Sequence, residues 1–161
     1  MKKQYLNRID LSLAAISANE AVARSIVGVA LSMLDPTVEE LADMRCAVSE
    51  AVTNAIVHGY KNGNSLMAAH CAPKVYISVR LYSDRSVAVE IRDRGVGIAD
   101  VEKAREPLYT TDETGERSGM GFAVMEAFTD SVRVTSRLGY GTRVLLSKKL
   151  SDAKEKENAD V

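Results

Sequence analysis

The sequence predicts an α+β fold, a two-layer sandwich in which helices cover one face of a mixed or antiparallel β-sheet. Three observations support this class: strand-like alternation recurs in several short segments, these segments outnumber the helical ones, and several consecutive strands meet at turns. No internal repeat or linker divides the 161 residues. We therefore expect one folded domain over residues 1–150 and a charged, disordered tail over residues 151–161.

The first strand and the first helix are expected within residues 5–34. Tyr5–Leu13 alternates apolar with polar residues, which is typical of a half-buried strand. Asn19–Leu34 has apolar residues at helical spacing and is followed by Asp35-Pro36, which stops a helix. The residues expected on the buried face of this helix are Val22, Ile26, Val29, Ala30 and Met33.

The second helix is expected to begin at Thr37 and to end at Gly59. Thr37 and Glu40 have the spacing of a capping box, and glycine is the residue most often found just past a helix end. Between them, apolar residues recur at helical spacing and mark one face. The residues expected on this face are Val38, Leu41, Met44, Val48, Ala51, Val52, Ala55 and Ile56.

The second half of the chain is expected to complete the sheet. Turn-forming residues separate its alternating stretches, so antiparallel strands joined by short turns are expected. The expected order is a loop at 60–73, strands at 75–81 and 87–91, a short helix at 99–105, a polar glycine-containing segment at 110–121, a helix through Phe122 and Phe128, and strands at 131–136 and 142–146.

Composition argues against several classes of function. The formal net charge of -1 gives no general attraction to a polyanion, so direct nucleic-acid binding is not expected. The N-terminus lacks the continuous apolar region of a signal peptide, and no later apolar run reaches membrane-spanning length. Cys46 and Cys71 have neither CxxC spacing nor clustered histidines, which argues against a disulfide framework and a zinc site. We therefore expect a soluble, cytoplasmic protein without a membrane partner.

Several reactive or charged residues are expected to have structural roles only. Cys46 is expected to be a small buried residue, because nothing near it in the sequence favours a reactive thiolate. His58, near a helix end, is expected to make a local hydrogen bond or dipole contact, and His70 is expected to be exposed in a loop. Lys148 and Lys149 are expected to belong to a solvated end of the chain.

The stretch SEAVTNAIVHGY places an acid, Glu50, and an amide, Asn54, one turn apart on the second helix. Residues four apart share a helix face, so both side chains can reach one ligand. A carboxylate can accept a proton from an attacking hydroxyl, and an amide oxygen can complete the oxygen shell of Mg²⁺. Taken alone, such a pair is more often a solvated helix face.

A second motif, DRGVGI, directly follows an expected strand. Gly95 and Gly97 allow positive φ and leave room for a flat ring, while Asp93 can accept a hydrogen bond from an exocyclic amine such as that of adenine. This is the pattern of a base pocket. Taken alone it is more often an ordinary Asp/Gly turn, and it is not the GxGxxG of a dinucleotide-binding fold.

A third motif, RSGMGF, places glycines where a helix begins. Free backbone N–H groups and the positive end of the helix dipole bind anions there, and Arg117 can add a charge-assisted contact. The preceding polar residues 110–116 can close over a bound nucleotide. A glycine-rich loop without function is an equally good interpretation of this motif alone. The chain contains neither a GxxxxGK[ST] phosphate loop nor the glycine loop, HRD and DFG signatures of protein kinases.

In their order along the chain, these motifs resemble the N, G1 and G2 boxes of the GHKL ATPase/kinase superfamily. Over residues 8–147 the sequence is similar to the anti-sigma F factor (stage II sporulation protein AB) family of GHKL serine protein kinases. The stretches that carry this resemblance are VSEAVTNAIVHGY, KVYISV, IRDRGVGI, EPLYTT and RSGMGFAVMEAF. The resemblance implies the Bergerat (GHKL) ATP-binding fold for residues 1–150, with ATP and Mg²⁺ as cofactors.

The resemblance also implies roles for individual residues. Glu50 corresponds to the catalytic base, Asn54 to the Mg²⁺ ligand, and Asp93 to the adenine-reading acid, with Gly95 and Gly97 shaping the base pocket. Other positions correspond to the lid and phosphate region (Thr110, Thr111, Arg117, Ser118, Gly119 and Gly121), to a second adenine-side contact (Thr142) and to a partner-binding surface arginine (Arg24).

What the resemblance implies about partners is equally specific. Proteins of this family form a homodimer, sequester a sporulation sigma factor when ATP is bound, and phosphorylate a serine of an anti-anti-sigma protein. Two features depart from the pattern: residues 65–73 form a longer segment than expected, and the tail matches no motif. Both bear on partner contacts more than on ATP binding.

Three alternatives remain open at the level of sequence. A general-stress anti-sigma kinase would share the fold and use other partners. A histidine-kinase-like catalytic domain would share the boxes, but it needs a phosphoacceptor histidine on a dimerisation helix, and neither His58 nor His70 has such a setting. A non-catalytic nucleotide-gated binding module would capture the sigma factor without transferring phosphate.

Overall fold

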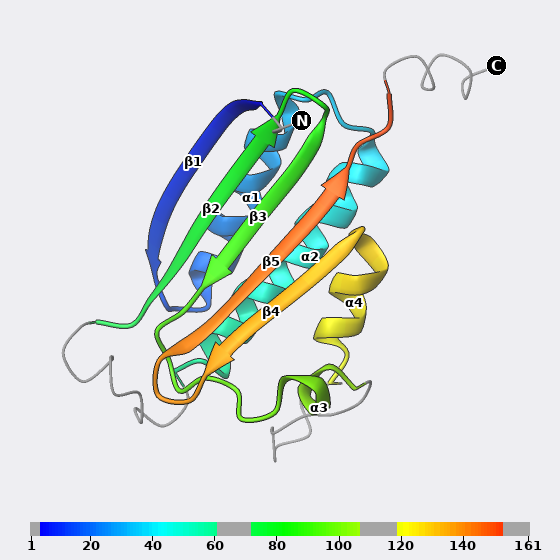
Figure 1. Cartoon of the computed structure of the whole chain (residues 1–161). Helices are drawn as coiled ribbons and strands as arrows, with labels where there is room; N and C mark the ends of the chain where they lie inside the picture. The colour runs from blue at the N-terminus through cyan, green and yellow to red at the C-terminus, as the bar shows by residue number, and fades with distance from the viewer. Residues whose placement is uncertain (1–3, 61–71, 107–118, 153–161) are drawn as a thin grey trace.

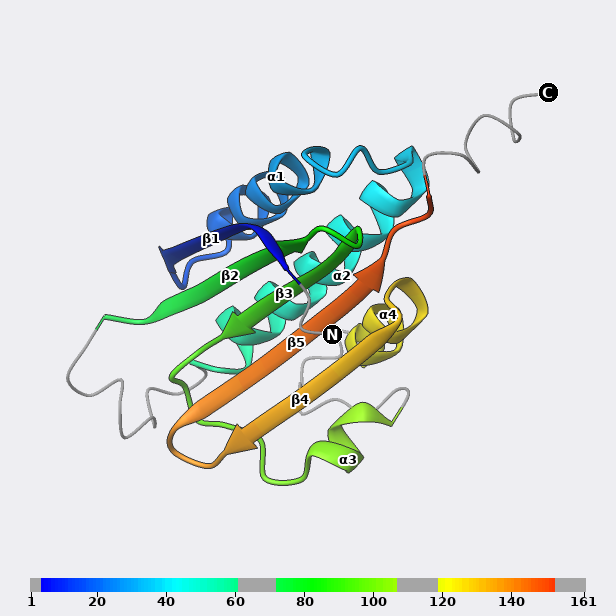
Figure 2. The same ribbon diagram turned by 45° about the horizontal axis from the view of Figure 1, so that its top comes forward.

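The structure, a computed structural model, describes residues 4–60, 72–106 and 119–152 and confirms the α+β class. The elements are β1 (Tyr5–Ala14), α1 (Ala18–Ser32), α2 (Val38–Val57), β2 (Lys74–Tyr82), β3 (Ser86–Arg92), α3 (Val101–Arg105), α4 (Gly121–Phe128), β4 (Ser131–Arg137) and β5 (Gly141–Lys149). The five-stranded sheet has the order β1-β2-β3-β5-β4, and every neighbouring pair is antiparallel. Helices α1, α2 and α4 lie against one face of this sheet, and no described helix covers the other face (Figures 1 and 2).

Most of the tail and most of the long loop after α2, including His70 and Cys71, lie outside the described residues. Among the described helices, none combines the length and the apolar character needed to cross a membrane.

The α2 helix begins at the capping box that the sequence predicts. The Thr37 hydroxyl accepts a hydrogen bond from the Glu40 N–H at 3.1 Å, and the Glu40 carboxylate accepts one from the Thr37 N–H at 2.8 Å. The other Glu40 oxygen accepts from the Ser151 N–H at 2.6 Å, so the end of the described chain is tied to the start of this helix. A cap of this kind stabilises a protein by about 1 kcal/mol.

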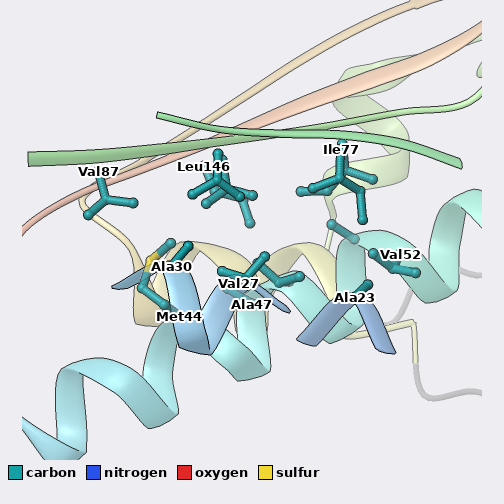
Figure 3. Packing of buried hydrophobic residues seen from close by; sticks show 14 of the residues in the cluster. Ala23, Val27, Ala30, Met44, Ala47, Val52, Ile77, Val87 and Leu146 are labelled. Atoms are coloured by element: carbon teal, nitrogen blue, oxygen red, sulfur yellow. The ribbon is translucent and has the colours of Figure 1, made fainter. Parts of the chain in front are cut away.

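The core lies between the inner face of the sheet and helices α1 and α2. Inward-pointing residues of the central strands, such as Ile77, Val87 and Leu146, meet small and branched residues of the two helices, such as Val27 and Val52 (Figure 3). The alternation along each strand decides which residues enter this layer. Truncating a large member of such a core to alanine costs about 2–5 kcal/mol.

The predicted buried face of α1 is correct at Ala30, which is 1% exposed, and wrong at three other residues. Val22, Val29 and Met33 are exposed, Val29 to 72%, while Ala23 and Val27 are fully buried. The helix carries two apolar stripes with the same period, and the structure buries the one that includes the small residues. Small side chains allow α1 to lie close to α2 and the sheet, which periodicity alone does not reveal. The residues buried on α1 are Ala23, Val27, Ala30 and Leu31.

Three further expectations are wrong. Val38, expected in the core, is exposed in the first turn of α2. Cys46, expected to be buried, is an exposed free cysteine, and partial desolvation together with the Glu50 and Asp43 carboxylates raises the pKa of its thiol. Lys148 is not solvated: its side chain is only 14% exposed, on the inner face of the sheet.

Lys148 is turned inward because it continues the alternation of Val144 and Leu146 along β5. Its Nζ donates to Asp43 Oδ2 of α2 at 3.0 Å and to the backbone oxygen of Phe128, the last residue of α4, at 2.9 Å. A cation at a helix C-terminus also interacts favourably with the helix dipole. Lys148 therefore joins α2, α4 and β5.

Candidate functional site

Glu50 and Asn54 lie where the C-terminal half of α2 meets the first turn of α4. A Cβ built on Gly121, the first residue of α4, would lie 3.1 Å from Glu50 Oε2 and 3.2 Å from Asn54 Nδ2. Any side chain at residue 121 would therefore enter the space in which the two polar groups meet the helix end. Within the described residues, neither side chain makes a hydrogen bond, so both can contact a ligand.

Asp93 follows β3 and is held in a buried position, 4% exposed. Its Oδ1 accepts hydrogen bonds from the Gly95 N–H at 2.8 Å and from the Thr142 N–H at 3.2 Å. The other carboxylate oxygen, Oδ2, has no hydrogen-bond partner in the described part of the chain. The backbone thus fixes the orientation of the carboxylate and leaves one oxygen to accept from a ligand amine.

The environment of Asp93 makes its carboxylate costly to ionise. Burial raises the pKa of the Asp93 carboxyl above its ordinary value, and the N–H groups of Gly95 and Thr142 only partly oppose this effect. A ligand that donates a hydrogen bond to Oδ2 would favour the charged form. Purine amines are donors of this kind.

Glycines allow the loop after β3 to contact the end of α2. A Cβ on Gly95 would lie 1.7 Å from the Gly59 carbonyl oxygen, which accepts a hydrogen bond from the Val96 N–H at 2.7 Å. A Cβ on Gly59 would lie 3.1 Å from Asp93 Oδ1. Gly95 is therefore needed for contact between the loop and the helix end, a reason that the motif alone does not supply.

Several residues that build the same pocket lie outside the predicted site residues. Gly141 has φ 104°, and a Cβ there would lie 2.3 Å from the Asp93 carbonyl oxygen. Ser136 Oγ accepts from the Ile98 N–H at 2.7 Å and lies 2.9 Å from Thr142 Oγ1. The GYG turn before Thr142 was a signal for Gly141, whereas nothing in the sequence singles out Ser136.

Tyr60, which also lies outside the predicted site residues, joins the end of α2 to the strands beside the pocket. Its hydroxyl donates to the Lys74 carbonyl oxygen at 2.5 Å and accepts from the Arg94 N–H at 3.1 Å. Burial raises the pKa of this phenol, so it stays protonated and keeps its donor at neutral pH. The loop that carries Asp93 is thus held from two sides.

The expected phosphate region is only partly described. Thr110, Thr111, Arg117 and Ser118 lie outside the described residues. Gly119 has φ 65°, which favours glycine, and Gly121 opens the helix beside Glu50 and Asn54. Gly97, with φ 74°, packs against the Arg137 carbonyl oxygen, 2.3 Å from the position of a Cβ.

Arg24 lies on α1, on the side that faces α2. Its Nη1 is 3.5 Å from Glu20 Oε1, and the same carboxylate oxygen accepts a hydrogen bond from the Ser49 hydroxyl. The Arg24 side chain is 40% exposed, so it can meet a second molecule. Because Ser49 precedes Glu50, this surface adjoins the helix that carries the polar pair.

The arrangement can bind a nucleotide from one end to the other. Helix α2 carries Glu50 and Asn54 along its length and contacts the Asp93 loop at its end. An amide oxygen at Asn54 suits Mg²⁺, which usually takes few protein ligands and fills its shell with phosphate oxygens and water. The donor set therefore fits a magnesium-bound triphosphate.

The chain is similar to known proteins in both sequence and fold. A family model described as a histidine kinase-like ATPase domain matches residues 13–148. The chain is 48% identical to the anti-sigma F factor of Bacillus subtilis over 148 residues, covering 92% of this chain and 96% of that protein. It is 46% identical to the anti-sigma F factor of Clostridium acetobutylicum over 145 residues, covering 90% and 95%.

Two solved structures share the fold at low sequence identity. The structure of the RsbU and RsbW domains of a Mycobacterium tuberculosis protein matches with a TM-score of 0.61 and 20% identity, over 91% of this chain and 33% of that chain. The histidine kinase domain of a blue-light activated kinase from Erythrobacter litoralis matches with a TM-score of 0.51 and 22% identity, over 73% and 48%.

Proposed function

The chain belongs to the anti-sigma F factors, within the histidine kinase-like ATPase domain family, and from this premise we propose that it is an ATP-dependent anti-sigma factor and serine kinase. It holds a sporulation sigma factor and phosphorylates a serine of an anti-anti-sigma protein in the cytoplasm. The observation that carries the proposal is the position of Glu50 and Asn54 against Gly121, on the helix whose end contacts the Asp93 loop.

The purine end of the site binds adenine. Asp93 Oδ2 accepts from the exocyclic amine of the base, and Thr142 makes a second contact on the same side. The pocket supports this role because two backbone N–H groups already orient the Asp93 carboxylate. Because the carboxylate is already oriented, binding the ligand costs no further conformational entropy at this side chain.

The phosphate end transfers the γ-phosphoryl group. Asn54 Oδ1 would hold Mg²⁺, which would supply positive charge to neutralise the phosphates. The first turn of α4, with Gly119 and Gly121, receives phosphate oxygens, and we assign Thr110, Thr111, Arg117 and Ser118 to the same region. Glu50 orients the acceptor serine and takes its hydroxyl proton as the Oγ–P bond forms and the bond from γ-phosphorus to the departing ADP breaks.

An assay with labelled ATP and purified candidate partners tests this function. Label should appear on the anti-anti-sigma protein and survive acid, as a phosphoserine does. Acid-labile label would instead favour a histidine-kinase-like domain, and sigma capture that depends on ATP without any transfer would favour a non-catalytic module. Transfer to a general-stress anti-anti-sigma protein alone would favour the general-stress alternative.

We propose that the protein acts as a homodimer and that Arg24 contacts a protein partner. The exposed apolar residues Val22, Val29 and Met33 lie along one side of α1, and β1 is the edge strand of the sheet, with no second neighbour among the described strands. The Asn7 amide of β1 contacts the Met33 sulfur at 3.3 Å, so the stripe and the strand adjoin. Sedimentation should show a dimer that Val29→Glu converts to monomers; an unchanged dimer would rule out this surface.

A further inference from the structure

The uncovered face of the sheet is rich in arginine. The helices lie on the other side of the sheet (Figure 2). Strand alternation turns the arginines of every strand away from them. Among the described residues of the five strands, only Asp10 and Glu90 bring acidic groups to the same side. We call this surface the arginine face, defined by Arg8, Arg80, Arg92, Arg133, Arg137 and Arg143.

The strand register places like charges opposite one another on this face. Arg92 of β3 pairs with Arg143 of β5, and Arg8 of β1 pairs with Arg80 of β2. Like charges directly opposite each other destabilise a sheet. In a chain whose net charge is only -1, this concentration of positive charge shows that acidic residues are gathered elsewhere.

The carboxylates on the arginine face are too few to pair with its cations. Glu90 Oε2 is shared by Arg80 and Arg143, each with an Nη2 at 2.6 Å. Asp10 pairs with Arg8 at 2.9 Å. Within the described part of the chain, Arg92 contacts no carboxylate, which leaves its guanidinium able to bind an external acid.

Tyr76 holds two guanidinium groups in place beside this uncompensated charge. The Arg92 and Arg94 guanidinium carbons each lie 5.0 Å from the centre of the Tyr76 ring. The stacked Arg92 guanidinium keeps its N–H edges available for bidentate contact with a carboxylate, and stacking limits the freedom that binding would remove. The adjoining surface has a shallow hollow of about 510 Å³, lined by residues that include Arg8, Asp10, Tyr76, Glu90 and Arg92.

We propose that the arginine face binds a carboxylate-rich segment of a partner protein. The charge of the face selects an acidic partner, and arginine forks match carboxylate geometry. A protein segment can place carboxylates against the arginines and hydrogen-bond donors against Asp10 and Glu90 in the same hollow, whereas the phosphate groups of a nucleic acid offer acceptors only. The face lies across the sheet from α2, so such a partner can bind whether or not the proposed nucleotide site is filled.

The test uses a fluorescent peptide of alternating glutamate and serine, and an otherwise identical peptide with glutamine in place of glutamate. The full-length protein should bind the glutamate peptide and not the glutamine peptide, with affinity that falls as salt is raised. Arg92→Gln combined with Arg143→Gln should weaken binding about tenfold, the effect of losing two exposed ion pairs. Arg45→Gln combined with Lys103→Gln removes the same charge from helices and should leave binding unchanged.

Several results would overturn the proposal. Equal loss in the two double variants would mean that net charge alone attracts the peptide. Tighter binding of an oligothymidylate with the same number of charges would assign the face to nucleic acid. If Arg92→Gln combined with Arg143→Gln changes the mass measured by sedimentation, the arginine face is an interface between copies of this chain. Circular dichroism must show both double variants folded, and loss of kinase activity would not affect the outcome.

Discussion

The two ends of the candidate site are built differently. At the purine end, backbone N–H groups hold the Asp93 carboxylate, and glycines bring three backbone segments into contact. At the phosphate end, Glu50 and Asn54 make no side-chain hydrogen bond within the described residues. One end is therefore preorganised by the fold, whereas the other has polar groups whose partners are the ligand and its metal. The comparison predicts which substitutions damage folding and which damage only chemistry.

Glu50→Gln should have the largest effect, on the rate of transfer alone. Glutamine keeps the size of the side chain and cannot take the proton of the acceptor serine, so the rate should fall about 10²–10⁴-fold. Because Glu50 has no partner to lose within the described residues, ATP affinity and the free energy of unfolding should stay close to the wild type. Single-turnover transfer and calorimetry measure the two effects separately.

Glu39→Gln, an exposed position in the first turn of the same helix, provides the control and should transfer phosphate at the wild-type rate. Wild-type rates in Glu50→Gln would remove Glu50 from the role of base. A large loss of ATP affinity would instead give it a binding role.

Gly95→Ala should damage the preorganised end through the fold. The new Cβ would lie 1.7 Å from the Gly59 carbonyl oxygen, and both atoms belong to backbone-fixed positions, so the loop must move away from α2. We expect a loss of about 3 kcal/mol in the free energy of unfolding, at the upper end of the cost of overpacking, together with weaker ATP binding. Urea denaturation and calorimetry check the two parts.

Gly28→Ala is the matched control, because its Cβ would meet only the Arg45 side chain, at 3.3 Å from Cδ. That flexible side chain can shift, and alanine favours a helix interior by about 0.5–1 kcal/mol, so this variant should be as stable as the wild type or more stable. Equal stability of Gly95→Ala would show that the contact at Gly59 is not essential.

Lys148→Met should affect the phosphate end from a distance. The substitution keeps most of the side-chain volume and leaves Asp43 and the Phe128 carbonyl oxygen without their cation. Because both ion-pair partners are only partly buried, we expect a loss of about 2 kcal/mol, below that of a fully buried pair. The neighbouring Lys149→Met is exposed and should change stability by less than about 0.5 kcal/mol.

Adding Asp43→Asn to Lys148→Met should restore part of the stability, since the unpaired carboxylate is then removed. If Lys148 also positions α4, Lys148→Met should weaken ATP binding at saturating magnesium, which Lys149→Met should not. Unchanged ATP affinity would limit Lys148 to a structural role.

The positions of the helices and strands follow from the sequence more closely than the contacts between them do. Prediction succeeds where the signal is local. Alternation, helical spacing and turn residues predict the described strands and helices, because these signals are local. Glu50 and Asn54 are singled out because an acid and an amide lie one turn apart on one helix face, and Asp93 because it opens a glycine motif directly after a strand. Prediction fails where tertiary context decides, as in the choice between two apolar stripes on α1. It also fails at Lys148, whose inward position follows from the register of β5 against its neighbours. The contact between Gly95 and Gly59 joins residues far apart in the chain, so no local pattern predicts it.

The smallest effect is the dependence of stability on pH, and it comes from the preorganised end. Burial raises the pKa of Asp93 in the folded protein above its ordinary value of 3.8, so the folded state binds the proton more tightly than the unfolded state. The contribution of Asp93 protonation to the free energy of unfolding is fully present below pH 3.8. It is lost as the pH rises through the pKa of Asp93 in the folded protein. Asp93→Asn cannot titrate there, so the stability of the wild type should decline relative to Asp93→Asn over that window.

Urea denaturation between about pH 3.5 and 7 measures this difference, with Asp152→Asn as an exposed control that should track the wild type. If the free energies of unfolding of the wild type and Asp93→Asn change with pH in parallel, the backbone donors fully offset the effect of burial on the pKa of Asp93. Adding Mg-ATP at neutral pH should reverse the order, because a purine amine donates to the ionised carboxylate and stabilises the wild type more than Asp93→Asn. The Asp93→Asn variant would present an amide donor toward that amine in place of an acceptor, so it should bind the nucleotide more weakly.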